Sequence, residues 1–335
     1  MSPVPLPLLL LALLPSAACY SVFIDGSAGT TGLQVRERLA GRADLTVIEP
    51  PASLRKDPAT RRAFLNKADA AILCLPDSAS REAARWLDED GNAGTVLVDA
   101  STAFRTDPSF AYGLPELSPA HREKLRTSTR ISNPGCYPTG FISLLAPLVA
   151  GGLVPPSLPA TVNAVSGYSG GGKPLIQLYE GGEECEPYGA YGFELSHKHM
   201  PEMALYAGLE REPLFQPAVG NFPQGMLVNV PLHYSQLAPG VTGARLAECL
   251  QQHYEGEPFV SVSAANSKSS FERGAFLRPD SLANTNKLEL FVNHNDDNGL
   301  VVLTARLDNL GKGASGAAVQ NLNLALGLDE TAGLL

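Results

Sequence analysis

The sequence predicts two domains, a doubly wound α/β domain on a parallel sheet followed by an α+β domain. Three observations predict this fold class. Up to about residue 135, near-continuous apolar strands alternate with helical segments, which is typical of a parallel sheet covered on both faces. After about residue 150, prolines cluster and the strands alternate apolar and polar residues, which is typical of an antiparallel or mixed sheet. The length of 335 residues fits two such domains.

The expected elements follow one another in this order. In the first domain, strands are expected at 19–25, 45–48, 70–76, 95–99 and 130–132, and helices at 33–39 and 78–87. In the second domain, strands are expected at 161–165, 226–230, 259–262, 288–292 and 300–307. Apolar residues at 318, 322, 325 and 326 have helical spacing and predict a helix near the C-terminus.

Composition and charge restrict the function. The net charge is −9, the isoelectric point is near 5.2, and no basic block is present, which argues against nucleic acid as a partner. The five cysteines are odd in number and widely spaced, so they do not resemble a disulfide framework. A reducing compartment is therefore expected, and the cytoplasm is the expected location.

The first 18 residues form an apolar leader. Its apolar run at 8–14 is far shorter than the roughly 20 residues that span a bilayer, so no membrane segment is expected. The first basic residue is Arg36, so the positive segment that opens a secretory signal is missing. Residues 16–18 (Ser-Ala-Ala) nevertheless resemble a cleavage site, so a signal peptide stays open as an alternative, as does organellar targeting. An extended or misassigned start is the preferred interpretation of this leader.

A glycine-rich turn, GSAGTTG at 26–32, lies between the first strand and the following helix. Its three glycines permit a tight turn and let backbone N–H groups approach a pyrophosphate at the helix N-terminus. An ordinary tight turn is the alternative, but the strand and helix around it favour a Rossmann-type dinucleotide site. The residues expected to bind the cofactor here are Gly26, Ser27, Gly29, Thr30, Thr31 and Gly32.

The choice between NAD and NADP rests on three residues after the second strand. Glu49 stands about 20 positions beyond the loop, where an acidic residue binds the ribose 2′-hydroxyl and favours NAD. Arg55 and Lys56 follow closely, and cations suit the 2′-phosphate of NADP. These residues alone leave both cofactors open.

One cysteine lies in the loop SNPGCYPTG at 132–140, just before an apolar segment that reads as a helix. A helix N-terminus stabilises a thiolate through its dipole and its free N–H groups. Pro134 and Pro138 stiffen the loop and hold the sulfur in place. The pattern predicts that Cys136 is a nucleophile that attacks an acyl carbon.

A nucleophilic thiol requires a base, and the stretch SHKHMPEM at 196–203 holds two histidines. Glu202 lies three residues after His199, where a carboxylate can orient the imidazole through its second nitrogen. His199 is therefore the expected acid/base, and His197 is the alternative. The H-x-H spacing followed by proline lacks the H-x-x-x-H spacing of helical metal sites, so no metal is expected.

Taken together, several stretches resemble the N-acetyl-gamma-glutamyl-phosphate reductase family in its short form (type 2). The matching stretches cover nearly the whole chain after the leader: FIDGSAGTTGLQVRERL, DASTAFR followed by YGLPEL, SNPGCYPTG, VSGYSGGGK, HKHMPEM, GMLVNVPL and KGASGAAVQNLNLALG. This family resembles the aspartate-semialdehyde and glyceraldehyde-phosphate dehydrogenases in fold. The resemblance implies a Rossmann domain at 19–135, a catalytic α+β domain at 136–312, and a C-terminal helix at 313–335 that returns to the nucleotide domain.

The resemblance also implies a reaction. It is the NADPH-dependent reduction of N-acetyl-L-glutamyl 5-phosphate to N-acetyl-L-glutamate 5-semialdehyde in arginine biosynthesis, through a cysteine thioester and with release of inorganic phosphate. Cys136 matches the family nucleophile, and His199 matches its acid/base with Glu202 orienting it. Arg105 and Asn133 look like the phosphate-contacting positions of related semialdehyde dehydrogenases.

Further features follow from the same resemblance. The family preference favours NADP(H), with Arg55 and Lys56 among its contacts. Ser169, Gly170 and Gly313 look like backbone that lines the nicotinamide side. Homo-oligomers are usual in the family, so a homo-oligomer is expected. The alternatives are a related acyl-phosphate reductase, of the aspartate-semialdehyde or aminoadipate type, and a cysteine hydrolase.

Overall fold

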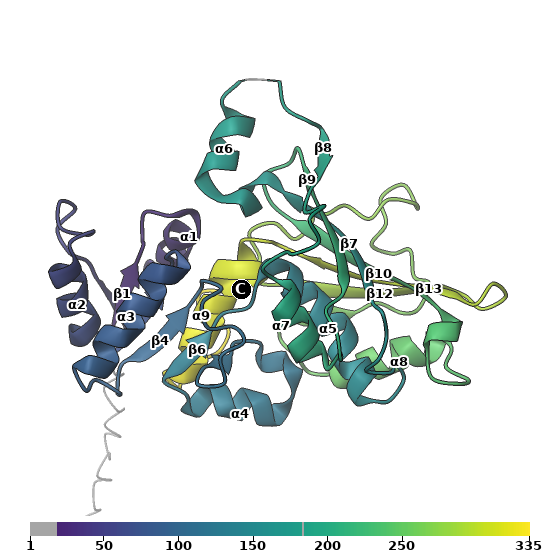
Figure 1. Cartoon of the computed structure of the whole chain (residues 1–335), viewed down its shortest axis with the longest axis horizontal. Coiled ribbons are helices and arrows are strands. Elements are labelled where there is room, and N and C mark those ends of the chain that lie inside the picture. Colours follow the sequence, from purple (N-terminus) through teal and green to yellow (C-terminus); the bar gives the residue numbers. More distant parts are fainter. Residues whose placement is uncertain (1–18, 183) are drawn as a thin grey trace, which may run out of the picture.

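The computed structural model describes residues 19–182 and 184–335, and the apolar leader at 1–18 lies outside the described residues. Within these ranges the chain forms two sheets, with the C-terminal helix α9 (Gly316–Ala325) between them (Figure 1). In the same ranges, no helix is both long and apolar enough to cross a bilayer. The fold class expected from the sequence, α/β followed by α+β, is confirmed.

The first sheet, in the described part of the chain, has six parallel strands in the order β2-β1-β3-β4-β6-β5. These strands are β1 (Tyr20–Asp25), β2 (Leu45–Ile48), β3 (Ala70–Leu73), β4 (Val96–Asp99), β5 (Ala111–Tyr112) and β6 (Arg130–Ser132). The helices of this domain are α1 (Thr30–Leu39), α2 (Pro58–Lys67), α3 (Asp77–Glu89) and α4 (Pro119–Thr127). Side chains that alternate along β1 pack into two separate cores, one with α1 and α4 and one with α2 and α3, so both faces of the sheet are covered.

The second sheet, again within the described residues, is a mixed sheet of seven strands in the order β11-β12-β13-β10-β7-β9-β8. Its strands are β7 (Thr161–Gly167), β8 (Tyr188–Ala190), β9 (Leu214–Gly220), β10 (Met226–His233), β11 (Val260–Val262), β12 (Leu288–Asn295) and β13 (Leu300–Leu307). The helices of this domain are α5 (Cys136–Ala150), α6 (Gly172–Glu180), α7 (Met200–Ala207) and α8 (Gly243–His253).

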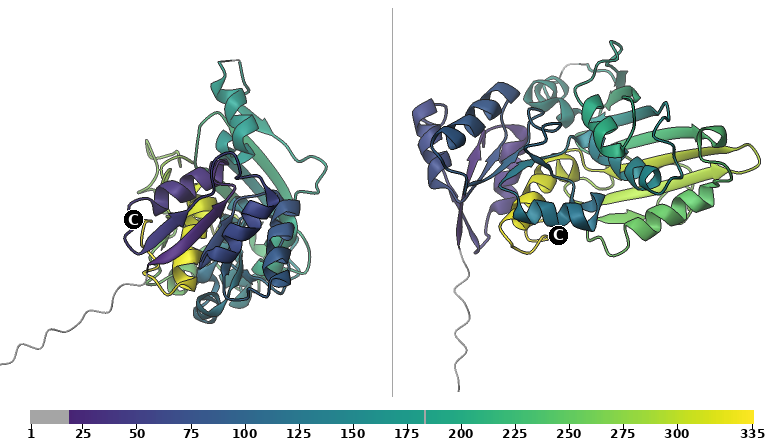
Figure 2. Two further views of the ribbon diagram at one scale, coloured as in Figure 1. Left: turned by 90° about the vertical axis from the view of Figure 1, so that its left-hand side faces the viewer. Right: turned by 60° about the horizontal axis from the view of Figure 1, so that its bottom comes forward.

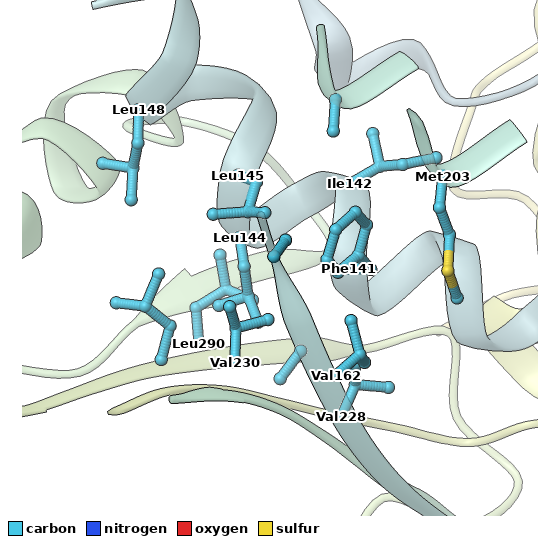
Figure 3. Packing of buried hydrophobic residues seen from close by; sticks show 14 of the residues in the cluster. Phe141, Ile142, Leu144, Leu145, Leu148, Val162, Met203, Val228, Val230 and Leu290 are labelled. Carbon is cyan, nitrogen blue, oxygen red and sulfur yellow. The ribbon is translucent and has the colours of Figure 1, made fainter. Parts of the chain in front are cut away.

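Helix α5 is the central element of the second core, because apolar residues surround it on nearly every side. Figure 3 shows its side chains Phe141, Leu144 and Leu145 directed at the sheet, where Val228 and Val230 of β10 meet them. All five side chains are fully buried. The packing fixes the position of the whole helix, and its first residue is Cys136.

The C-terminal helix α9 leaves the second sheet and packs against the first. Val319 and Leu322 are fully buried in the same core as Val22 and Ile24 of β1. Figure 2 shows this helix beside the strands of the nucleotide domain. The segment just before α9 therefore spans the junction between the two domains.

The sequence expectation omitted several elements of the fold, among them strand β9, and it placed the start of helix α1 too late. Strand β9 was not expected, because Pro217 interrupts its apolar run and proline is rare inside sheets. It nevertheless pairs with β7 in parallel and with β8 in antiparallel. Helix α1 begins at Thr30 rather than at Leu33, so Thr30 and Thr31 belong to its first turn.

Candidate active site

A cavity of about 730 Å³ lies between the two domains. Both Cys136 and His199 line it, together with Arg105 from the nucleotide domain. The start of α1, the start of α5 and the segment before α9 form its other walls. The structure thus brings the expected nucleophile and the expected base into one cavity.

Cys136 is the first residue of α5, and Gly135 is its N-cap residue. Strand β6 leads directly into this loop, so the sulfur lies at the carboxyl end of the parallel sheet, where such folds bind ligands. A Cβ on Gly135 would come within 2.7 Å of both Arg105 Nη1 and Glu202 Oε1 and within 2.9 Å of His199 Nε2. Only a glycine at position 135 leaves room for these three side chains to pack against the backbone beside the sulfur.

A buried ion pair organises this wall of the cavity. Arg105 Nη1 donates to Glu202 Oε1 at 2.7 Å, and the side chains are 8% and 1% exposed. The other oxygen of Glu202 accepts from the Tyr112 hydroxyl at 2.7 Å and from the Gly135 N–H at 3.2 Å. The carboxylate therefore fixes both the guanidinium and the loop that carries the nucleophile.

The structure contradicts the expectation that Glu202 orients His199. Among the described residues, Glu202 forms no hydrogen bond with His199, and the Nδ1 atom of His199 is buried without a partner. The reason is competition, since a guanidinium cation binds a carboxylate more strongly than a neutral imidazole does. The backbone N–H of His199 instead donates to Nδ1 of His197 at 3.2 Å.

Burial decides the charge of the imidazole. It lowers the pKa of His199 well below the ordinary value of 6.5, and the charge of Arg105 lowers this pKa further. The imidazole is neutral near pH 7 and can accept a proton, which is the state that a general base requires.

Burial also decides the charge of the sulfur. It raises the pKa of Cys136 above the ordinary 9.0, against the opposing effects of Arg105 and of the Tyr137 N–H. The thiolate expected from the helix N-terminus is therefore not the resting form. The cavity holds a thiol beside a neutral imidazole, and the proton must move as the reaction begins.

The segment before α9 closes the cavity beside the sulfur. A Cβ on Gly313 would lie 2.7 Å from Cβ of Cys136, so this glycine permits the close approach. Its neighbour Lys312 is fully buried, and Lys312 Nζ donates to Glu116 Oε1 and to Gln320 Oε1 at 2.6 Å each. These bonds anchor the π-helical turn Gly311–Ser315 across the domain junction.

Of the other expected residues, Ser169 and Gly170 line the cavity, whereas Asn133 lies outside its lining. The Ser169 hydroxyl accepts from Nδ2 of Asn309 at 2.9 Å. Asn133 does not fit the expected phosphate contact, because it is 1% exposed and its amide already binds Ala314 O at 2.9 Å and Asn321 Nδ2 at 3.1 Å. It supports the junction instead.

A second cavity, of about 380 Å³, surrounds the glycine loop. Gly26 has φ +87, and a Cβ there would lie 2.3 Å from the carbonyl oxygen of Cys74. A Cβ on Gly32 would lie 2.3 Å from the Gly26 carbonyl oxygen. Both glycines are therefore required for the turn, which leaves a cradle for a pyrophosphate. Ser27 and Gly29 line this cavity, whereas Thr30 and Thr31 line the first one.

The cations around this second cavity bear on the cofactor. Arg55 and Lys56 line it, whereas Glu49 forms an ion pair with Arg36 at 3.3 Å and does not. Lys173, from the start of α6 in the other domain, lines it as well. This arrangement fits a cofactor with an additional phosphate.

Sequence reasoning missed three residues near these cavities, Tyr112, Lys173 and Lys198. Tyr112 holds Glu202 from β5, a two-residue strand that has no periodic signal. Lys173 and Lys198 lie in two of the stretches that carry the resemblance, VSGYSGGGK and HKHMPEM, but their approach to the cavities depends on the fold.

A glycine-loop cradle next to a half-buried thiol and a buried imidazole defines a class, the NAD(P)-dependent dehydrogenases that act through a cysteine. Two family models agree: the semialdehyde dehydrogenase NAD binding domain matches residues 27–125, and the semialdehyde dehydrogenase dimerisation domain matches residues 136–309. The crystal structure of aspartate semialdehyde dehydrogenase II from Vibrio cholerae, complexed with ASA, has a TM-score of 0.66 at 16% identity and covers 92% of this chain and 98% of that one. The aspartate semialdehyde dehydrogenase with NADP from Candida albicans has a TM-score of 0.61 at 12% identity, with the same coverage.

Curated relatives narrow the class. The N-acetyl-gamma-glutamyl-phosphate reductase of Trichormus variabilis is 49% identical over 320 residues, which are 93% of this chain and 98% of that protein. The protein of the same name from Chelativorans sp. is 47% identical over 306 residues, 91% of this chain and 97% of that protein. The chain belongs to the N-acetyl-gamma-glutamyl-phosphate reductase family.

Proposed function

We propose that this protein reduces N-acetyl-L-glutamyl 5-phosphate to N-acetyl-L-glutamate 5-semialdehyde with NADPH and releases phosphate, as a step of arginine biosynthesis. The observation that carries the proposal is the single cavity in which Cys136, His199 and the start of α1 meet. Relatives named N-acetyl-gamma-glutamyl-phosphate reductase match 93% and 91% of this chain, and we infer the substrate from that name.

The chemistry begins with the thiol. His199 takes the proton of Cys136, the sulfur attacks the acyl carbon, and the carbon–oxygen bond to phosphate breaks with the electron pair leaving on phosphate. Bound NADPH supplies the hydride that reduces the resulting thioester carbonyl. The carbon–sulfur bond then breaks to release the aldehyde, and Cys136 regains a proton. His199 handles the protons, because it lines the same cavity as the sulfur and is neutral.

The residues around the glycine loop fit NADPH. Gly26 and Gly32 leave the space that a pyrophosphate needs, since a Cβ at either position would clash with backbone. Arg55 and Lys56 supply positive charge for the 2′-phosphate, and Glu49 is held away by Arg36. Arg105, Ser169, Gly170 and Gly313 line the neighbouring cavity and would contact the substrate or the nicotinamide end.

The assembly and location belong to the same proposal. The protein works as a homo-oligomer, which the family description of residues 136–309 as a dimerisation domain supports. It works in the cytoplasm, which its cysteines support, because all five are described and all are free thiols.

The decisive experiment runs the reaction in reverse. Purified protein is given NADP, inorganic phosphate and N-acetyl-L-glutamate 5-semialdehyde, and the absorbance of NADPH is followed. A phosphate-dependent rise is expected with this aldehyde, and a rise at least about tenfold smaller in kcat/KM with aspartate semialdehyde. Equal activity on both aldehydes, or activity without phosphate, would contradict the proposal.

A further inference from the structure

We propose that Lys198 binds the phosphate group of the substrate through its ammonium group. The inference rests on the proposed acyl-phosphate chemistry and deepens it. It adds a phosphate-binding residue to which the steps above give no role.

Arg105 does not offer an unpaired positive charge to the phosphate. Its guanidinium is matched by the buried carboxylate of Glu202 at 2.7 Å, so the pair is neutral. Other N–H groups of Arg105 already donate to Asn133 O at 2.9 Å and to Ala100 O at 3.4 Å. A phosphate group that carries a charge of about −2 would meet a neutral pair here, and an anion leaving water without a cation is costly.

Lys198 adds a second cation to this cavity, which Glu186 also lines. Lys198 lines the same cavity as Cys136 and Arg105, directly before His199 in the chain. Its side chain is exposed, and within 19–182 and 184–335 it forms no ion pair. Burial is the main cause of the shifted pKa of Cys136 and of His199, and the positive charge of Lys198 is a smaller contribution that lowers both.

The phosphate is a better match for this lysine than the other anionic group of the substrate. The phosphate is bonded to the acyl carbon that the sulfur attacks, whereas the α-carboxylate lies three carbons away along the side chain. Because Lys198 lines the cavity of Cys136, we expect the phosphate to be the nearer of the two anionic groups to it. Lysine serves such a group as a mobile point charge on a flexible stem.

The test measures the oxidation of the aldehyde with inorganic phosphate as the varied substrate. Lys198→Met is expected to raise the KM for phosphate about 10- to 100-fold, which is the loss of one charge-assisted hydrogen bond. The KM values for NADP and for the aldehyde should stay unchanged. Lys198→Arg keeps the charge and should retain most of the phosphate affinity. Lys287→Met, which removes an exposed lysine that does not line either cavity, is the matched control.

A second measurement does not depend on the aldehyde. The alkylation of Cys136 by iodoacetamide is followed by mass spectrometry of the peptide that contains it, because the chain has four other free cysteines. Inorganic phosphate should slow the alkylation of this peptide in the wild type and in Lys287→Met. Phosphate should protect Lys198→Met only at about 10- to 100-fold higher concentration.

Each outcome has one meaning. If the wild type shows no phosphate-dependent activity, the proposed function fails, and the alkylation series still decides the role of Lys198. If the wild type is active and Lys198→Met leaves both the phosphate KM and the protection unchanged, the inference alone is wrong. If Lys198→Met raises the KM for the aldehyde and not the KM for phosphate, Lys198 binds the α-carboxylate and the inference is wrong.

Discussion

The two cavities of this protein are built in different ways. The glycine-loop cavity surrounds one contiguous stretch, 26–32, in which a strand, a turn and a helix follow one another directly. The catalytic cavity is assembled from segments that are far apart in the chain, with Arg105, Cys136, His199 and Gly313 on its walls. Buried ion pairs and hydrogen bonds hold these segments together.

This difference determines which substitutions should impair each site. A site made by one local motif depends on the residues of that motif. An assembled site also depends on positions that carry no chemistry, because they set how closely the segments approach one another. Gly135 is such a position, since three side chains from two domains converge on it.

The largest effect is expected at the nucleophile. Cys136→Ser should lower kcat by on the order of 10⁴-fold or more, because a hydroxyl is a far weaker nucleophile than a sulfur and no other group can form the thioester. NADPH binding, followed by fluorescence titration, should stay intact, because the glycine loop lies in the other cavity. Near-normal turnover in this variant would refute covalent catalysis.

The base should come next. His199→Asn should lower kcat by about 10²- to 10⁴-fold, the usual contribution of a general acid/base. Steady-state kinetics of His199→Asn and His197→Asn, measured side by side, show which histidine contributes more to kcat. A larger loss in His197→Asn would transfer the role to that histidine.

Gly135→Ala tests the assembled cavity at a position without chemistry. The added methyl group would displace Arg105, Glu202 and His199, and a shift of this size should lower kcat by about 10²-fold. Gly94→Ala is the matched control, because the nearest atom to its Cβ is 4.0 Å away, and kcat should stay unchanged. Equal effects of the two substitutions would show that the convergence on Gly135 has no catalytic consequence.

The local cavity should respond more mildly to substitution. Arg55→Ala and Lys56→Ala should each raise the KM for NADPH about tenfold and leave that for NADH nearly unchanged, because the residues are exposed and bind only the additional phosphate. Initial rates with both cofactors measure this ratio. A parallel rise for NADH would mean that the two residues bind the common part of the cofactor.

The smallest effect concerns stability in acid. Burial holds the pKa of His199 well below 6.5 in the folded state, so between pH 6.5 and the folded pKa the unfolded chain binds more protons. Stability should therefore rise with pH in this window and fall by about 1 kcal/mol between pH 6.5 and 5.5. Urea unfolding at pH 6.5 and at pH 5.5 measures this loss of stability. In His199→Asn the loss between the two pH values should be about 1 kcal/mol smaller than in the wild type.

Sequence reasoning was strongest where the structure is local. The strand, turn and helix around the glycine loop follow from apolar runs and glycine positions, and Cys136 at the start of α5 follows from the loop before it. It was weaker where a contact joins distant segments. Strand β9 and the two-residue strand β5 gave no usable signal, since pairing with neighbours, not their own pattern, makes them strands.

The sequence by itself determined the fold class and the cofactor loop, and it predicts Cys136 as the nucleophile and His199 as the base, because these depend on short-range backbone geometry and on residue chemistry. Only the tertiary structure decided that Glu202 binds Arg105 instead of His199, and that Asn133 supports the junction. It also decided that the resting Cys136 is a thiol. The physical reason is the same in each case: burial removes water, so partners and charge states are set by whichever groups the fold brings into contact.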